Sequence, residues 1–260
     1  MDSVSHHDEP GVGLAAGYWA ESARPMTSLV FVAPLLVVYE LGVVVLGPES
    51  VRNGADQWLR DLLQCAGFGQ YVLLPVLTVV ILLSWHHTTG EPWRFTSGVL
   101  SGMLVECVLL ALGLCFLLQL QGAVFEAAVA APGAPVGAPV AAIDVAGTVR
   151  DAVGFLGAGV YEELLFRLML LPAAAWTLQR LGTSRRRSVL FAVLATSLIF
   201  AAAHYVGDQA DLLRLTDAAF WFSLTFRFLA GVFFSLLFVY RGFGIAAGTH
   251  AGYDILVGLF

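Results

Sequence analysis

Residues 97–121 read SGVLSGMLVECVLLALGLCFLLQLQ, and Glu106 is the one charged residue among these 25 positions. A helix needs about 20 mostly apolar residues to cross the hydrocarbon core of a bilayer. A membrane β-barrel would instead show segments of roughly ten residues in which apolar and polar side chains alternate strictly. The stretch therefore predicts a transmembrane helix, and it decides the fold class.

The composition of the whole chain agrees with this prediction. Of its 260 residues, 58% are hydrophobic and 12% are charged, whereas a soluble domain has roughly 25% charged residues. The expected fold is all-α, a polytopic transmembrane helical bundle of about seven spans (six to eight). We place these spans at about 27–47, 71–87, 97–121, 148–172, 188–207, 218–240 and 242–260.

The chain divides into three parts. Residues 1–26 form a polar N-terminal segment, residues 27–147 form a first membrane half, and residues 148–260 form a second membrane half. Within the first half, residues 48–70 fit a short amphipathic helix at the interface or a buried loop helix. An Ala/Pro/Gly tract at 127–140 predicts a loop outside the membrane.

The distribution of charge predicts the orientation and limits the partners. Arg180 and the run 185–187 follow the fourth predicted span, so this loop is expected to be cytoplasmic, and with it the N-terminus. The net charge is −6 and no basic face is clustered, which argues against a nucleic-acid partner. Membrane lipid is the expected environment.

Ionisable residues inside the apolar spans are the strongest functional signal. A charge at the bilayer centre costs from about 2.5 to more than 10 kcal/mol, so such residues normally face the bundle interior and mark a site. Glu163 and Arg167 are four residues apart in the fourth span and can pair on one helix face. Glu162 lies about 100° further around the helix, which makes it the better candidate for a general base.

Two later spans repeat the four-residue spacing. Phe200 and His204 share a face of the fifth span, and His250 and Asp254 share a face of the seventh. A carboxylate that can deprotonate water, beside imidazoles that can hold the water or donate to a developing oxyanion, is typical of hydrolysis.

These motifs, Glu-Glu-x-x-x-Arg, Phe-x-x-x-His and His-x-x-x-Asp, resemble the CAAX prenyl endopeptidase and bacteriocin-processing (CPBP, or Abi) family of intramembrane proteases. The resemblance covers about residues 148–260 and implies a CPBP-like catalytic membrane domain there. It implies that Glu162 and His204 activate a water molecule and that His250 and Asp254 form or support the oxyanion site. Glu163, Arg167 and Phe200 would have supporting roles.

The residue at position 254 departs from the family pattern. Prenyl proteases of the family typically have Asn where this chain has Asp254. An ionised Asp cannot donate a hydrogen bond, so Asp254 is expected either to orient His250 or to stay protonated.

The resemblance implies an endopeptidase that acts on a membrane-associated, hydrophobic or lipidated peptide or protein. The all-Arg, Ala-rich composition looks bacterial, so a bacterial plasma membrane is expected, and peptide maturation or bacteriocin self-immunity is favoured over cleavage of a prenylated protein. A proton- or ion-coupled transporter uses similar intramembrane charges, and a non-catalytic scaffold or immunity protein stays open as a third hypothesis. The oligomeric state is not predicted.

A metal is a separate question. Two His and several carboxylates could bind zinc, and Glu162, His204 and His250 would then be the ligands. The zinc-protease motif H-E-x-x-H is not present in the sequence, so a metal-free glutamate mechanism without a cofactor is favoured.

Three charged residues in the spans fit none of the motifs. They are Glu40, Glu106 and Arg227. We expect structural or interfacial roles for them, with one of the two glutamates pairing with Arg227.

Overall fold

The computed structural model describes residues 17–47, 52–69, 72–129, 145–206 and 215–259. Within these ranges the regular structure is helical and no strand occurs, which confirms the all-α prediction. The N-terminal segment before residue 17 and most of the predicted Ala/Pro/Gly loop lie outside the described residues.

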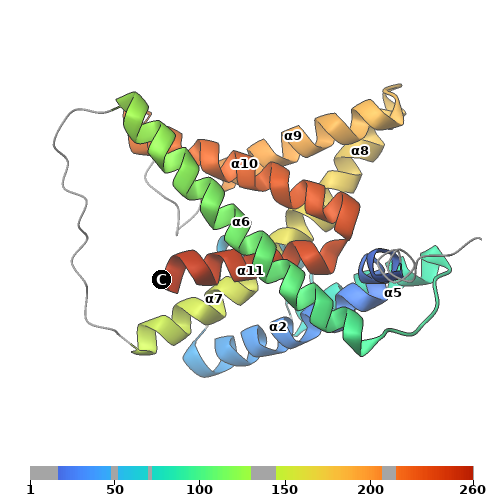
Figure 1. Cartoon of the computed structure of the whole chain (residues 1–260). Coiled ribbons are helices and arrows are strands. Elements are labelled where there is room, and N and C mark those ends of the chain that lie inside the picture. Colours follow the sequence, from blue (N-terminus) through green and yellow to red (C-terminus); the bar gives the residue numbers. More distant parts are fainter. Residues whose placement is uncertain (1–16, 48–51, 70–71, 130–144, 207–214, 260) are drawn as a thin grey trace, which may run out of the picture.

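The helices follow one another along the chain as shown in Figure 1. In order they are α2 (Pro25–Leu46), α4 (Gly54–Cys65), α5 (Leu73–Thr89), α6 (Ser97–Val129), α7 (Val145–Glu163), the π-helix η1 (Leu164–Leu170), α8 (Leu171–Arg180), α9 (Arg185–Ala203), α10 (Ala218–Arg241) and α11 (Phe243–Leu259).

Helix α11 lies at the centre of the bundle (Figure 1). It packs against α7, α6, α10 and α2, and the chain from residue 241 through 247 is buried without interruption. On one side of α11, α9 packs against both α8 and α10, and α2 and α7 lie on the other side. The C-terminal helix therefore connects the two sides.

Small residues allow α7 and α11 to approach closely. A Cβ atom built on Gly159 would lie 2.6 Å from the Cβ of Ala251 and 2.7 Å from the carbonyl oxygen of Ala247. Real Cβ atoms do not approach this closely, because native interiors are already packed to crystal density. The absence of a side chain at residue 159 therefore sets the spacing of these two helices.

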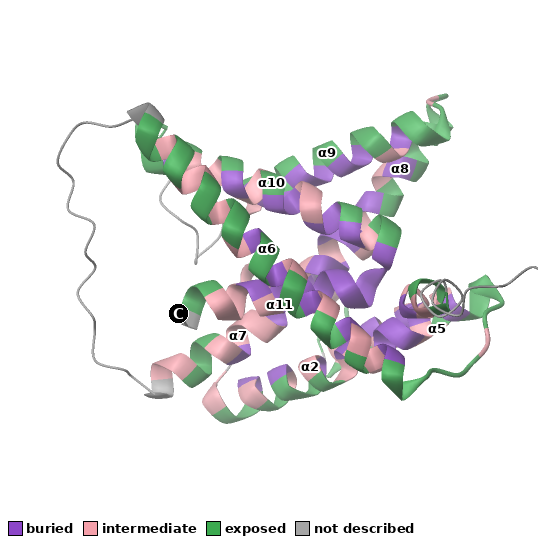
Figure 2. Cartoon of the chain, viewed as in Figure 1, coloured by how far each residue is buried: buried purple, intermediate pink, exposed green. Residues whose placement is uncertain are grey.

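Apolar side chains cover much of the outer surface. In Figure 2, α6 and the outer side of α9 carry many exposed residues. On α6 these residues include large apolar side chains such as Leu109, Phe116 and Val124. A large exposed apolar surface marks contact with another apolar phase, which for helices of this length is lipid. The chain is an integral membrane protein.

In the described part of the chain, four helices are long and apolar enough to cross a membrane. They comprise Pro25–Leu46, Ser97–Ala127, Arg185–Ala203 and Ala218–Arg241, and α5 is a shorter apolar helix. The predicted span over 148–172 is corrected, because it is not one α-helix. The α-helix α7 ends at Glu163, and a seven-residue π-helix separates it from α8.

The short helix expected within 48–70 is α4. The side chain of Asn53 caps its first turn by accepting a hydrogen bond from the backbone N–H of Asp56 at 2.8 Å. The helix buries Ala55, Asp56 and Leu59, exposes Leu62, and packs against α7 and α5. It is thus an amphipathic helix with one buried face.

Candidate active site

Glu163 and Arg167 form the buried ion pair that their spacing predicts. The Nη1 group of Arg167 donates to Oε1 of Glu163 at 2.9 Å, and both side chains are almost completely inaccessible. The Nη2 group of Arg167 also donates to the carbonyl oxygen of Gly231 on α10, at 3.3 Å. Arg167 therefore ties the α7–η1 segment to α10.

Arg167 lies within the π-helix η1. The backbone N–H of Leu171 donates to the carbonyl oxygen of Phe166, five residues earlier, as the wider π turn requires. Insertions of this kind are rare and often occur at functional sites. The guanidinium carbon of Arg167 lies 4.2 Å from the ring centroid of Phe200, in the range of a cation–π contact. The segment thus brings a charged group against an aromatic wall.

His250 on α11 lies between three carboxylates. Its Nδ1 atom is 2.8 Å from Oε1 of Glu163. Its Nε2 atom is 3.5 Å from Oδ2 of Asp254 and 3.8 Å from Oε2 of Glu162. An ionised Glu163 can only accept, so Nδ1 carries the donated hydrogen and Nε2 faces the other two carboxylates. The ring of Phe234 stacks on the imidazole at 4.4 Å, with 13° between the planes.

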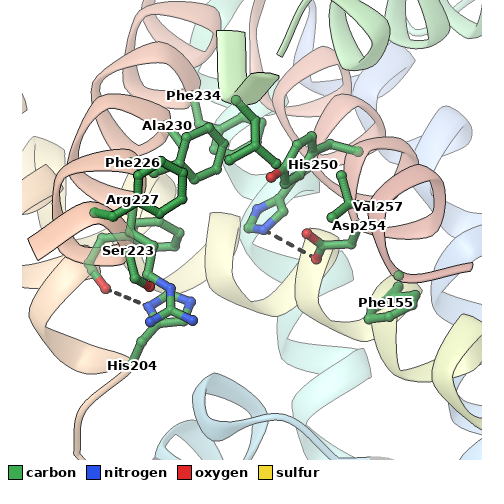
Figure 3. A pocket seen from close by; sticks show the side chains of 15 residues that line it. Phe155, His204, Ser223, Phe226, Arg227, Ala230, Phe234, His250, Asp254 and Val257 are labelled. Carbon is green, nitrogen blue, oxygen red and sulfur yellow. Dashed lines mark hydrogen bonds and ion pairs between the residues drawn. The ribbon is translucent and has the colours of Figure 1, made fainter. Parts of the chain in front are cut away.

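His204 lies at the C-terminal end of α9. Its Nδ1 atom is 2.9 Å from the carbonyl oxygen of Phe200, and the two rings are in edge contact at 5.0 Å. Figure 3 shows His204 and the His250–Asp254 pair at different places on the wall of one cavity. Among the described residues, no hydrogen bond joins His204 to Glu162 or to His250.

The cavity has a volume of about 330 Å³ and walls from α6, α7, α9, α10 and α11. Most of the lining side chains are aromatic or aliphatic. The polar ones are His204, Ser223, Arg227, His250, Tyr253 and Asp254. An apolar cavity with a few converging polar groups is the usual form of a binding site. Glu162 does not line it directly but contacts the lining residue His250.

Two buried carboxylate oxygens in this cluster have no hydrogen-bond partner among the described residues. They are Oε2 of Glu162 and Oε2 of Glu163. A buried acceptor without a partner is uncommon in native proteins and calls for an explanation. These oxygens leave acceptor capacity for a water molecule or a substrate group.

The structure brings most of the predicted residues together. Glu162, Glu163, Arg167, His250 and Asp254 form one connected cluster. Phe200 joins His204 to this cluster through rings, since its centroid lies 5.0 Å from that of His204 and 6.0 Å from that of His250.

The predicted partners of Arg227 are wrong. Glu40 accepts from Arg60 and from the hydroxyl of Tyr161, and Glu106 pairs with Arg241. Arg227 instead lines the cavity (Figure 3). Its charge within an apolar helix was a signal for this location, but sequence spacing does not specify partners on other helices.

Sequence reasoning also missed Phe234 and Gly231. Phe234 stacks on His250, and Gly231 offers its carbonyl oxygen to Arg167. Nothing in the sequence distinguishes this phenylalanine from the other phenylalanines of α10. Nor does the sequence distinguish this glycine from a glycine that only allows close packing of helices.

Three side chains were expected as ligands if a zinc ion is bound: Glu162, His204 and His250. Among the residues that the structure describes, no group of three His, Cys, Asp or Glu side chains has the arrangement of a metal site. Around Nε2 of His250 lie Oδ2 of Asp254 at 3.5 Å and Oε2 of Glu162 at 3.8 Å.

Comparison with known proteins identifies the domain that holds this cluster. No curated protein and no solved structure matches the chain. Residues 148–256 match the family model described as type II CAAX prenyl endopeptidase Rce1-like. The matched segment contains all of the predicted site residues, and the predicted resemblance is confirmed. Residues 148–256 thus form an Rce1-like domain, which matches the CPBP/CAAX protease family.

Proposed function

We propose that the chain is an intramembrane glutamic endopeptidase that cleaves a membrane-associated, hydrophobic or lipidated peptide or protein. One observation carries this proposal: His250 is held by Glu163 through one ring nitrogen and faces Glu162 and Asp254 with the other, at the wall of a mostly apolar cavity. The family match favours a peptidase over the transporter and the scaffold hypotheses. In a bacterial membrane, peptide maturation or self-immunity would suit this activity.

The proposed reaction begins at Glu162. Its unpartnered Oε2 takes a proton from a water molecule that His204 helps to hold, and the hydroxide attacks the carbonyl carbon of the substrate. The carbonyl oxygen becomes an oxyanion. In this proposal His250 is an imidazolium, so that Nδ1–H donates to Glu163 and Nε2–H donates to the oxyanion. Glu162 then returns the proton to the amide nitrogen, the C–N bond breaks, and the amine leaves.

The remaining residues position the reacting groups in this proposal. Glu163 holds the imidazole of His250 through Nδ1, and Arg167 holds Glu163. Asp254 lies 3.5 Å from Nε2 and orients it. Reacting groups keep the geometry that catalysis requires when the side chains that hold them are themselves fixed by packing and hydrogen bonds.

A cleavage assay tests the mechanism. Purified protein is incubated with a panel of labelled hydrophobic and lipidated peptides and is compared with Glu162→Ala and His204→Ala. We expect each substitution to lower kcat/KM by about 10²–10⁴-fold, the range for general acid–base groups. Glu126→Ala, which removes an exposed carboxylate from α6, is the matched control and should retain activity. Cleavage that survives either active-site change contradicts the mechanism.

The same assay tests the metal-free assignment. A strong chelator should leave the rate unchanged if Glu162 alone activates the water. A loss of activity that added zinc restores would assign that role to a metal ion, for which Glu162, His204 and His250 remain the expected ligands.

We also propose that the N-terminus and the turn between α8 and α9 lie on the cytoplasmic side. The arginines at 180 and 185–187 favour this side. Arg24, at the start of α2, pairs with Glu91 at 2.9 Å, so the end of α5 lies at the same level as the start of α2. Reporter domains fused at the N-terminus and inserted at Gly182 should report the cytoplasm, and a periplasmic signal at either position would reject this orientation.

A further inference from the structure

A second cavity lies between α9 and α10 and shares no lining residue with the active-site cavity. Its volume is about 590 Å³. The lining residues are Arg185, Arg186, Val189, Leu190, Val193, Leu236, Val239 and Tyr240, and we call this set the α9–α10 groove. Apart from the two arginines at one end, its walls are aliphatic side chains and one tyrosine.

The groove runs from the end of a membrane span toward its interior. Arg185 and Arg186 occupy the first turn of α9, whereas Val193 lies eight residues further along. At 1.5 Å per residue this is a depth of about 12 Å. The last turn of α10 provides the opposite wall through Val239 and Tyr240. A ligand that follows this groove would have a polar end at the membrane boundary and an apolar body beside the span.

Positive charge is concentrated at the open end of the groove. A turn with Gly182 at φ +89° joins α8 to α9 and brings Arg180 near the run 185–187. From residue 164 to residue 206 the sequence contains no Asp or Glu. Within the described part of the chain, Arg185, Arg186 and Arg187 have no ion-pair or hydrogen-bond partner, and all three are exposed.

The end of α9 adds donors to this charge. Ser184 at the N-cap makes no side-chain hydrogen bond to the helix, so the first backbone N–H groups of α9 are available. Such groups and the helix dipole favour an anion. Guanidinium groups bind phosphate with two parallel hydrogen bonds.

We propose that the α9–α10 groove binds an anionic phospholipid. The phosphate lies at Arg185, Arg186 and the first turn of α9, and one acyl chain follows the apolar walls formed by Val189, Val193 and Val239. Basic pockets between membrane helices bind anionic headgroups in this way. The proposal does not depend on the peptidase mechanism, because none of these residues belongs to the active-site cluster.

Native mass spectrometry of the full chain tests this proposal. Protein stripped of lipid in a neutral detergent is titrated with phosphatidylglycerol or with phosphatidylcholine of the same acyl chains. We expect phosphatidylglycerol to bind about tenfold more tightly or better, from two arginines near the headgroup. Arg185→Gln combined with Arg186→Gln should remove this preference. The control, Arg94→Gln with Arg150→Gln, removes the same amount of charge from exposed positions outside the groove and should keep the preference.

A variant of the apolar wall tests the acyl-chain part separately. Val239→Trp fills the groove without changing charge and should weaken the binding of phosphatidylglycerol. The substituted side chains are exposed, so unchanged far-ultraviolet circular dichroism is expected for every variant. Equal binding of the two lipids, a preference that survives the double arginine change, or full displacement of the lipid by excess inorganic phosphate would each overturn the proposal.

Discussion

Two clusters of buried and partly buried charged residues meet at α7, and they differ in how completely their carboxylates are hydrogen-bonded. The first joins α2, α4 and α7 through Glu40, Asp56, Arg60 and the hydroxyl groups of Tyr39 and Tyr161. Every carboxylate oxygen there has a partner, such as Nε of Arg60 at 2.6 Å from Oδ1 of Asp56 and the hydroxyl of Tyr39 at 2.9 Å from Oδ2.

The second cluster begins one residue later on the same helix. Glu162 and Glu163 each keep one buried oxygen without a hydrogen-bond partner among the described residues. A fully satisfied network rigidifies a fold, whereas an open acceptor in a buried site is costly and is retained where chemistry needs it. The contrast suggests that Tyr161 belongs to the support and Glu162 to the reaction.

The largest effect is expected from exchanging one carboxylate in each cluster. Glu162→Gln should lower kcat/KM by about 10²–10⁴-fold while leaving the free energy of unfolding unchanged or raised, because activity and stability trade against each other at such sites. Glu40→Gln should do the reverse. It should cost about 1–3 kcal/mol of stability and leave kcat near that of the parent protein.

Unfolding in mixed micelles and initial cleavage rates measure the two quantities. The contrast between the clusters breaks down if Glu162→Gln destabilises as much as Glu40→Gln, or if Glu40→Gln abolishes turnover in protein that is still folded.

The buried pair within the second cluster gives the next largest effect. Glu163→Gln leaves the guanidinium of Arg167 buried without its carboxylate, and we expect a loss of about 3–5 kcal/mol in the free energy of unfolding. Replacing both residues, Glu163→Leu with Arg167→Leu, should recover much of that stability. It should not recover activity, because His250 would still lack its partner at Nδ1.

Thermal denaturation together with the cleavage assay separates these outcomes. Restored activity in the double variant would show that Glu163 does not position His250.

A packing change offers a test that alters no charge. Gly159→Val places a side chain against Ala247 and Ala251 and should destabilise the protein by about 1–3 kcal/mol through overpacking. It should also lower kcat, since α7 and α11 carry the two sides of the Glu163–His250 contact. Gly98→Val on α6, where a Cβ would meet nothing within 4 Å, is the control. An unchanged kcat in folded Gly159→Val protein would contradict this dependence.

The smallest effect is expected at Asp254. An amide oxygen can accept from His250 as a carboxylate does, so Asp254→Asn should change kcat/KM by less than about tenfold, or roughly 1.4 kcal/mol. A loss of a hundredfold would mean that the reaction uses the negative charge of Asp254. Asp254→Ala, which removes the hydrogen-bonding group, should be the more damaging substitution in the same assay.

Long apolar segments and local pairs could be predicted from the sequence. The spans expected at 97–121 and 218–240 correspond to α6 and α10, because continuous apolar runs with polar ends leave little freedom in placing a helix. The Glu163–Arg167 pair could be predicted because both residues lie on one helical segment, where a separation of four places side chains on one face.

Contacts between helices could not be predicted in this way. Arg227 lines the cavity and Glu40 pairs with Arg60, because these partners depend on how the helices pack and not on spacing along one of them. The approach of His250 to Glu163 depends on the missing side chain at Gly159. The π-helix after Glu163 could not be predicted from composition either. It is accompanied by contacts of Arg167 with Gly231 on α10 and with Phe200 on α9, and these contacts depend on the packing of the helices.

Because of this π-helix, the relative orientation of the site residues depends on the number of residues in one short segment. An α-helix turns by about 100° for each residue. One extra residue accommodated within Leu164–Leu170 therefore rotates α8, which follows this segment, by about that angle relative to α7, which precedes it. The direction in which α8 leaves, and with it the path of α9 to His204 at its far end, follows from this rotation. The number of residues in this segment thus helps to set how Glu162 on α7 is oriented relative to His204 at the end of α9.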